Sequence, residues 1–592
     1  MSNQKINNIL FNPQLYSTDL LELQDLSSKI KKNRTNLIFS KEIVIDTSSD
    51  YTLTFLEEML HLFLFNRKIK SEINSTSFGS LNFLIRDLDN KFWKSKSDIT
   101  LLIPSSRKLN FLPDATDSNE LIIKKAKKEA DIWIQVWKNT NKNIIQTTFD
   151  PLPYSNLGNL DSSKPGGYSH YIKIVNSILQ ENSPTNVNLI DLDILQNRNK
   201  NFNLYDNKMF YLSKQPFSMD AVPYISNLIS SLVAGIIGMA KKVLITDLDN
   251  TLWGGVIGDD GVNNIKIGDS SSEGESYSNF QKYLKSLTQK GIVLCVCSKN
   301  DFKIANDAFI KNSNMELNKN DITMFVANFR DKASNIKYIS KTLNLGLDSF
   351  IFIDDSSIEC ELVKQKLPEV MVVNLSNQDP SDFIDIVENT YPFYFKKITK
   401  EDLDRSKSYK QIASLNVKSK SSSDLDQFLK GLQPKILIKE VDNNTIERSA
   451  QLIAKTNQFK LNSRLFSPKQ LISKKINSLS ITFKDKFHNY GIISSLVYKI
   501  SRTDKSIYIE NWVMSCRVFS RRIEDFIIDY LITIAKKNNF SKISFDFELT
   551  KKNIYLQKFF TEIGLKINKN KKYLINLKEF KINKRNYIKM IK

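Results

Sequence analysis

A short apolar strand that ends in two carboxylates constrains the fold of this chain more than any other feature. Residues 242–251 read KVLITDLDNT, so the apolar run leads directly into Asp247 and Asp249. Continuous apolar runs are typical of strands buried in parallel sheets, and α/β proteins bind ligands at the carboxyl ends of such strands. The spacing lets Asp247 ligate Mg²⁺ and face a phosphorus or acyl centre, while Asp249 serves as acid and base.

Further polar residues follow in an order that supports a phosphate site. Ser298 ends the apolar run GIVLCVCS, Lys332 opens the helical pattern KASNIKYISKTLN, and Asp354 and Asp355 end SFIFIDD. The serine can donate to a phosphate oxygen, the lysine can neutralise phosphate charge, and the two carboxylates can complete a Mg²⁺ site. Together with the first pair they resemble the four motifs of the haloacid dehalogenase (HAD) superfamily.

The 592 residues predict several domains of α/β class. Strand-like runs alternate with amphipathic helical patterns, and the last part has an α+β order that resembles an N-acyltransferase (GNAT-like) fold. We expect an N-terminal extension at 1–34, a first α/β domain at 35–235, a HAD-like Rossmannoid domain at 240–390, linker helices at 391–433 and a GNAT-like domain at 434–592.

A narrower resemblance covers roughly residues 200–560. The segments TDLDNTLWGGVIGDDG, CSKND, KASN, LGLDSFIFIDD, TKEDLDRSKSY, KTNQF and SCRV resemble the FkbH family. That resemblance implies an SGNH-hydrolase-like region, a capless HAD domain and a GNAT-like domain in one chain. It also implies a Mg²⁺-dependent glyceryl transferase/phosphatase in secondary-metabolite or surface-polysaccharide biosynthesis.

The family resemblance implies a reaction and a partner as well. The substrate would be 1,3-bisphosphoglycerate or a similar acyl phosphate, and the acceptor would be the phosphopantetheine thiol of an acyl carrier protein. Cys297, in CSKN, would hold the acyl group as a thioester. Asp247, Asp249, Asp354 and Asp355 would hold the metal, and Thr251, Ser298 and Lys332 would bind substrate. There is no room for a cap domain between Asp247 and Cys297 or between Lys332 and Asp354. A site without a cap stays open, which suits a substrate carried on a protein.

The outer regions depart from active-enzyme patterns. Ser77 is a candidate hydrolase nucleophile, but none of the three histidines stands in the D-x-x-H context of such hydrolases. We therefore expect a degenerate binding or docking domain. In SCRVFSRRIE, Ser520, Arg521 and Arg522 replace the glycines of a coenzyme A pyrophosphate turn, although these arginines and Arg517 can meet a phosphate.

Composition excludes several classes. Four cysteines exclude a disulfide scaffold, the N-terminus lacks a signal pattern, and the apolar run 225–240 is too short and interrupted for a membrane span. The formal charge of +21 is spread along the chain without a nucleic-acid-binding signature, so we expect no binding to nucleic acid. The low cysteine count and the missing signal pattern predict a cytoplasmic protein. Three alternatives remain: a plain phosphatase with Asp247 as nucleophile, a vestigial adaptor, and an acyltransferase that works through the C-terminal domain.

Overall fold

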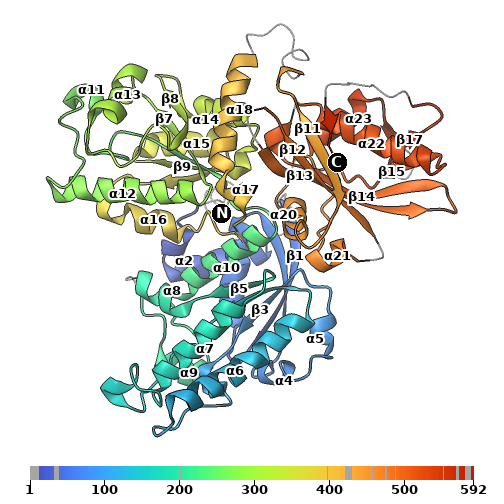
Figure 1. The fold of residues 1–592 in the computed structure, drawn as a ribbon. Coiled ribbons are helices and arrows are strands. Elements are labelled where there is room, and N and C mark those ends of the chain that lie inside the picture. The colour runs from blue at the N-terminus through green and yellow to red at the C-terminus, as the bar shows by residue number, and fades with distance from the viewer. Residues whose placement is uncertain are drawn as a thin grey trace. The chain divides into compact units, whose positions relative to one another are not determined.

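The computed structural model shows two compact units of chain (Figure 1). It describes residues 12–32, 39–199, 202–395, 398–419, 430–456, 458–473, 476–486, 489–519, 521–550, 553–567, 572–580 and 588–591. Internal contacts group Met1–Ile236 with Asp385–Lys397, and Ile237–Ile384 with Ile398–Lys592.

The first unit is built on a five-stranded parallel sheet in the order β2-β1-β3-β4-β5. Its strands are β1 (Lys41–Ser49), β2 (Ile69–Ser75), β3 (Ile99–Ile103), β4 (Asn143–Thr147) and β5 (Val187–Ile190). Its helices are α2 (Leu20–Lys32), α3 (Thr54–Asn66), α4 (Leu81–Leu84), α5 (Lys91–Lys94), α6 (Asn119–Asn139), α7 (Tyr168–Asn182), α8 (Leu192–Arg198), α9 (Asn207–Ser213) and α10 (Val222–Ile236). Every residue of α10 is buried, so most of the apolar run 225–240 lies in a helix packed inside the protein. In the part of the chain described, no helix combines the length and apolarity needed to cross a bilayer.

A second parallel sheet, in the order β10-β9-β6-β7-β8, begins the other unit. Its strands are β6 (Val243–Thr246), β7 (Val293–Ser298), β8 (Ile322–Ala327), β9 (Phe350–Asp354) and β10 (Met371–Asn374). The helices between and after them are α11 (Ile257–Asp260), α12 (Ser272–Gln289), α13 (Phe302–Lys311), α14 (Lys332–Leu343), α15 (Ser357–Lys366) and α16 (Phe383–Asn389). β7 and β9 lie on opposite sides of β6, so the chain reverses its direction across the sheet at β6, the position where α/β sheets bind ligands at the carboxyl ends of their strands. The sequence-predicted α/β class with a Rossmannoid sheet is confirmed.

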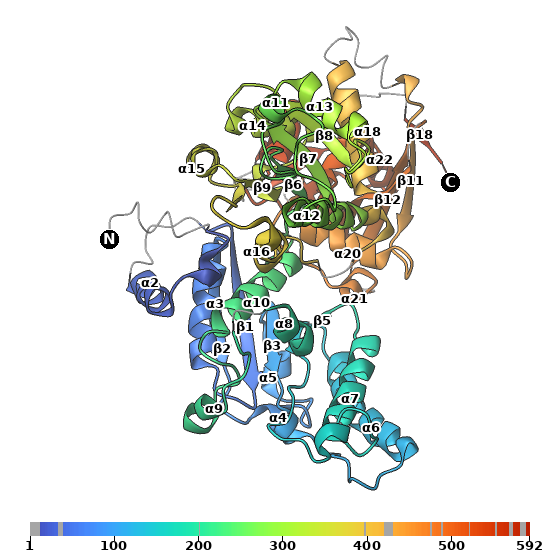
Figure 2. The ribbon, with the colours of Figure 1, turned by 90° about the vertical axis from the view of Figure 1, so that its left-hand side faces the viewer.

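Helices cover both faces of this sheet (Figure 2). α14 and α15 pack on one face together with α18 (Arg405–Ser419), which contributes Tyr409 and Ile412 to the core around Val243 and Ile245. The predicted linker therefore includes a helix that buries side chains against the sheet; the short α17 (Lys400–Leu403) precedes it. α12 and α14 begin at side-chain caps, where Ser271 and Asp331 accept from backbone N–H groups.

The C-terminal part has an eight-stranded mixed sheet in the order β16-β17-β15-β14-β13-β12-β11-β18. The strands are β11 (Lys435–Glu440), β12 (Asn477–Lys484), β13 (Asn489–Ser501), β14 (Ser506–Met514), β15 (Lys542–Phe545), β16 (Lys566–Ile567), β17 (Tyr573–Asn576) and β18 (Lys589–Met590). The helices are α20 (Ile446–Lys455), α21 (Pro468–Leu471), α22 (Ile523–Lys537) and α23 (Ile554–Glu562). β11 to β14 form an antiparallel meander, and β14 pairs in parallel with β15 after the crossover through α22. This α+β order agrees with the predicted GNAT-like fold.

Candidate active site

Three carboxylates meet at the carboxyl ends of β6 and β9. The backbone N–H of Asp247 donates to the Ile353 carbonyl at 3.1 Å, which places the end of β6 beside the end of β9. Asp247, Asp354 and Asp355 each bring an oxygen within 4.8 Å of the others. Parallel strands align their ends at one edge of a sheet, and this alignment brings residues that lie about a hundred positions apart into one group.

Lys332 is buried among these carboxylates. It is the first residue of α14, whose N-cap Asp331 accepts from Ser334 N at 3.0 Å. Its Nζ donates to Asp247 Oδ2 at 2.7 Å and to Asp354 Oδ2, and only 2% of the side chain is exposed. Burial by itself lowers the pKa of Lys332, but the two carboxylates raise that pKa above its usual value, so the ammonium is held charged.

The carboxylates of β9 have raised pKa values. Burial, followed by the charge of Asp247, raises the pKa of Asp354 to about 7. The same two causes raise the pKa of Asp355, although Thr251 Oγ1 donates to Asp355 Oδ1 at 3.2 Å. Thr251 is fully buried, and its hydroxyl supports the Asp355 carboxylate. Its predicted contact with substrate stays a prediction.

One oxygen of this group has no hydrogen-bond partner among the described residues. Asp247 Oδ1 is buried and accepts no hydrogen bond, whereas Oδ2 of the same carboxylate accepts from Lys332. A buried carboxylate oxygen without a donor is destabilising unless a cation or ligand group meets it. Oxygen ligands from Asp247, Asp354 and Asp355 are the donor set that Mg²⁺ prefers, so the residues present fit this ion.

The side chain of Asp249 is not part of this group of three carboxylates, and its predicted place among the metal ligands stays a prediction. Its Oδ1 accepts from Trp253 Nε1 at 2.9 Å and from Ile257 N at 3.1 Å, and its Oδ2 accepts from Asn300 Nδ2 at 2.9 Å. The chain has left the strand at this point, and Asn250 takes a left-handed φ of 49°, which turns Asp249 toward the following loop. Three donors thus fix the orientation of the Asp249 carboxylate next to the three carboxylates of the candidate metal site.

Two of these orienting residues were not assigned roles from the sequence. Asn300 lies two positions after Ser298, and its Nδ2 also donates to Ser298 Oγ at 3.1 Å. The sequence could have indicated this role of Asn300 through its position in the CSKN segment, because a side-chain amide just after a strand end can reach a neighbouring carboxylate. Trp253 is completely buried, and its indole N–H donates to Asp249. The two glycines after it predicted a turn, but nothing in the sequence indicated this contact.

Cys297 lies behind the site rather than in its opening. It is fully buried with Val243, Cys295 and Ile336, and its thiol lies 3.8 Å from the Lys332 carbonyl oxygen. Burial raises the pKa of this thiol well above its usual value. Alternate residues of β7 point to the same face of the sheet, so Cys297 shares with Cys295 the face that packs under α14. Its role as a nucleophile stays a prediction.

The segment after Asp249 folds as the expected tight turn. Gly254 exchanges backbone hydrogen bonds with Lys266, N to O at 3.0 Å and 2.8 Å. A Cβ on Gly254 would lie 2.8 Å from Glu273 Oε1 and 2.9 Å from Tyr277 Cε2, so only glycine fits without a shift. Between β6 and β7 the described chain forms this turn, α11 and α12, and no inserted domain covers the site.

The outer regions do not assemble the catalytic groups that their motifs suggested. Ser77 is exposed in the loop after β2, while His61 on α3 pairs with Ser71 Oγ at 2.6 Å and His170 lies on α7. His488 lies outside the described residues.

The arginines after β14 are engaged within their own domain. Arg517 donates to the Tyr490 carbonyl at 3.4 Å, and Arg521 forms a buried ion pair with Asp485 at 2.5 Å. Arg522, with a φ of 64°, approaches Asp525 at 3.9 Å. Ser520 of this segment lies outside the described residues. These ion pairs reduce the capacity of Arg521 to meet a phosphate, contrary to expectation.

Comparison with known proteins agrees with this architecture. Residues 44–234 match the family model described as FkbH, N-terminal domain. The structure of the N-terminal part of the protein BF1531 from Bacteroides fragilis, which contains a phosphatase domain complexed with Mg, is 27% identical with a TM-score of 0.58 and covers 64% of this chain and 100% of its own. A GNAT-family acetyltransferase from Staphylococcus aureus Mu50 is 15% identical with a TM-score of 0.20, over 24% of this chain and 99% of its own. No curated protein matches the chain. The predicted resemblance to the FkbH family is therefore confirmed, because residues 44–234 match the model of that family's N-terminal domain.

Proposed function

We propose that the second unit removes phosphate from a small phosphorylated acid in a Mg²⁺-dependent reaction at Asp247. The observation that carries this proposal is the buried, partnerless Asp247 Oδ1 beside Asp354, Asp355 and the charged Lys332. The Bacteroides fragilis structure supports it, because its phosphatase domain was solved with Mg.

The residues supply the parts of a phosphoryl transfer. Mg²⁺ held by Asp247, Asp354 and Asp355 would draw negative charge from the phosphoryl oxygens. Asp247 Oδ1 attacks phosphorus, the bond to the leaving oxygen breaks, and Asp249 gives that oxygen its proton. Asp249 then takes a proton from the water that hydrolyses the aspartyl phosphate. Lys332 orients Asp247 through Oδ2 and leaves Oδ1 available for the attack.

We further propose that the acid is an acyl phosphate such as 1,3-bisphosphoglycerate, whose ester phosphate is removed at Asp247. Its acyl group passes to the phosphopantetheine thiol of an acyl carrier protein: the thioester bond forms as the bond between the acyl carbon and the acyl phosphate breaks, and inorganic phosphate leaves. The resemblance to the FkbH family supports this step, as does the lack of an inserted domain over the described site. An open site suits a substrate carried on a protein. A thioester on Cys297 would require the start of α14 to move, because the thiol lies beneath the Lys332 main chain.

Intact-protein mass spectrometry tests both the removal of phosphate and the transfer of the acyl group. The full chain, Mg²⁺, enzymatically generated 1,3-bisphosphoglycerate and a phosphopantetheinylated carrier protein are incubated together. Cys297→Ala is compared with Cys295→Ala, a matched control that is buried on the same strand. A glyceryl-sized mass gain on the carrier that Cys297→Ala alone abolishes would establish the transfer and the role of the cysteine.

The complete burial of Cys297 favours a plain phosphatase as the second candidate. In that case neither cysteine variant changes phosphate release, no adduct forms on either protein, and Asp247→Asn abolishes turnover. Phosphate release that survives Asp247→Asn would refute both candidates, because both use Asp247.

A further inference from the structure

Lys299 is an exposed residue between two buried ones at the carboxyl end of β7. Ser298 and Asn300, on either side of it, are 1% and 7% exposed, whereas 41% of the Lys299 side chain is exposed. The Ser298 carbonyl accepts from Asn328 N at 3.1 Å. Asn300 Nδ2 donates to Asp249 Oδ2 at 2.9 Å and to Ser298 Oγ at 3.1 Å. The main chain that carries Lys299 is therefore fixed beside the candidate active site.

An ion pair joins Lys299 to the first turn of α15. Its Nζ lies 2.5 Å from Glu359 Oε1. Lys299 follows β7 and Glu359 follows β9, and these two strands flank β6, after which Asp247 comes. Because neighbouring strands lie about 4.8 Å apart, the pair spans roughly 10 Å of the sheet edge. It thus holds an ammonium group at the edge of the sheet where Asp247 lies.

Glu359 restrains this ammonium group. Its own N–H donates to the N-cap Ser356 Oγ at 3.4 Å, and Ser356 N donates to Asp354 Oδ1 at 2.9 Å, which ties the start of α15 to a candidate metal ligand. The Glu359 side chain is 12% exposed, and its Oε2 is buried with no hydrogen-bond partner in the described chain. A carboxylate so far withdrawn from water favours a cation close by. Glu359 therefore keeps Lys299 at the sheet edge.

The Lys299 ammonium can still bind an anion. An ammonium has three N–H donors, and Glu359 Oε1 accepts one of them. Lys332, deeper in the site, is 2% exposed and already donates to two carboxylates. Lys303 and Arg330 are exposed at the same edge, but neither forms an ion pair with a described residue. Of these four cations, Lys299 combines an anchored position with access from solvent.

We propose that Lys299 binds a second anionic group of the substrate while the phosphoryl group faces Asp247. This inference rests on the function proposed above and gives the site its substrate class: phosphate monoesters that also carry a carboxylate or a second phosphoryl group. An ammonium forms charge-assisted hydrogen bonds with either group. Glu359 is a positioning residue, because it orients Lys299 and does not itself meet the substrate anion.

Two esters that differ in one group test this role. 3-Phosphoglycerate has a carboxylate where glycerol 3-phosphate has a hydroxymethyl group, and phosphate release by the full chain in Mg²⁺ gives kcat/KM for each. We expect the natural chain to favour 3-phosphoglycerate at least about tenfold. Lys299→Met should lower this ratio at least about tenfold by raising KM for 3-phosphoglycerate. The matched control is Lys311→Met, which removes an exposed ion pair with Asp307 at the other end of α13 and should keep the ratio within about twofold.

A double variant separates substrate binding from charge neutralisation. If Lys299 only neutralises Glu359, Lys299→Met/Glu359→Gln removes both charges and restores the preference for 3-phosphoglycerate. If Lys299 binds the carboxylate, the double variant keeps the low ratio of Lys299→Met. Thermal unfolding checks that each variant is folded. Equal kcat/KM for the two esters in the natural chain, or the natural ratio in the double variant, would overturn the proposal.

Failure of the proposed phosphatase function gives a different result. The natural chain would then release phosphate from neither ester, and calorimetric titration in Mg²⁺ would measure the binding of both, because neither is consumed. Tighter binding of 3-phosphoglycerate that Lys299→Met removes would still support the role of Lys299. Equal binding of the two esters by the natural chain would overturn it.

Discussion

Replacing Lys332 with methionine should destabilise the second unit strongly while preserving the length of the side chain. The ammonium is 2% exposed and meets Asp247 and Asp354, so its removal leaves two buried carboxylates facing each other. Removing one partner of a buried ion pair typically lowers the free energy of unfolding by ~3–5 kcal/mol. We expect a loss of that size at pH 8 in EDTA.

The loss should depend on pH in a definite direction. The pKa of Asp354 is about 7 with Lys332 present, and removal of the ammonium raises that pKa further. An acid with a higher pKa in the folded chain binds its proton preferentially there, so lowering the pH stabilises the folded variant. Between pH 8 and pH 6 the destabilisation should therefore shrink by about 1 kcal/mol. Added Mg²⁺ should reduce it as well.

Urea unfolding of the full chain, followed by circular dichroism, measures this effect. Hydrogen exchange of peptides from β6 and β9 assigns the transition to the second unit. Lys337→Met is the control, because Lys337 is exposed on the same helix and its replacement should change the unfolding free energy by less than about 0.5 kcal/mol. A loss no larger than in this control, or one that is equal at pH 6 and pH 8, would refute the reasoning.

Three other variants give separate predictions. Asp247→Asn should lower phosphate release at least about 10³-fold by removing the nucleophile, and calorimetry should show weaker Mg²⁺ binding; unchanged values for both would contradict the assignment. Trp253→Phe removes a 2.9 Å donor to Asp249, so kcat should fall about tenfold with KM unchanged, and an equal kcat would show that the contact is not needed. Because burial lowers the pKa of Lys455 to about 7, the folded chain releases this proton before the unfolded chain does. The free energy of unfolding should then rise with pH between 7.5 and 9.5, and it should rise more steeply than in Lys455→Met, by up to about 1.4 kcal/mol per pH unit. Urea unfolding at several pH values measures this, and an equal dependence on pH in both chains would argue against the shift.

The order of the catalytic groups could be read from the sequence because it follows from strand ends. Asp247, Ser298 and Asp354 each close an apolar run, and parallel strands place such ends at one edge of a sheet. The two parallel sheets follow from the same alternation of strands and helices. The local sequence pattern was sufficient to predict these strand ends, because each apolar run and the polar residue that follows it are neighbours in the sequence.

Contacts between distant residues required the tertiary structure. The sequence placed Asp249 with the metal ligands, but Trp253 and Asn300 hold its carboxylate away from them. Cys297 shared a segment with Ser298, yet the alternation of β7 sends its side chain into the core. Spacing alone does not give either outcome, because tertiary contacts decide which face of β7 packs under α14 and which donors surround Asp249.

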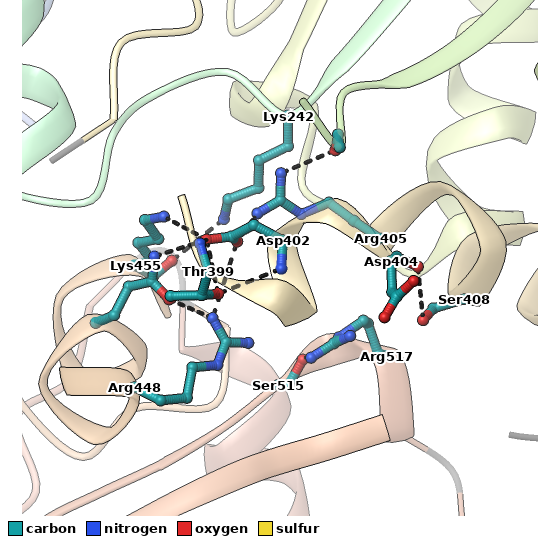
Figure 3. A network of polar contacts seen from close by, with 12 residues as sticks. Lys242, Thr399, Asp402, Asp404, Arg405, Ser408, Arg448, Lys455, Ser515 and Arg517 are labelled. Carbon is teal, nitrogen blue, oxygen red and sulfur yellow. Dashed lines mark hydrogen bonds and ion pairs between the residues drawn. The ribbon is translucent and has the colours of Figure 1, made fainter. Parts of the chain in front are cut away.

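The charged residues around Asp402 show the same limit most clearly, because Arg405, Arg448 and Lys455 all form ion pairs with this carboxylate (Figure 3). Asp402 and Lys455 are 53 positions apart, and Lys242 precedes Lys455 by 213. Each reads in the sequence as an ordinary charged residue of a lysine-rich chain. Their chemical character arises only when α18 and α20 pack at the amino edge of the sheet, since burial there removes the water that would otherwise screen each charge.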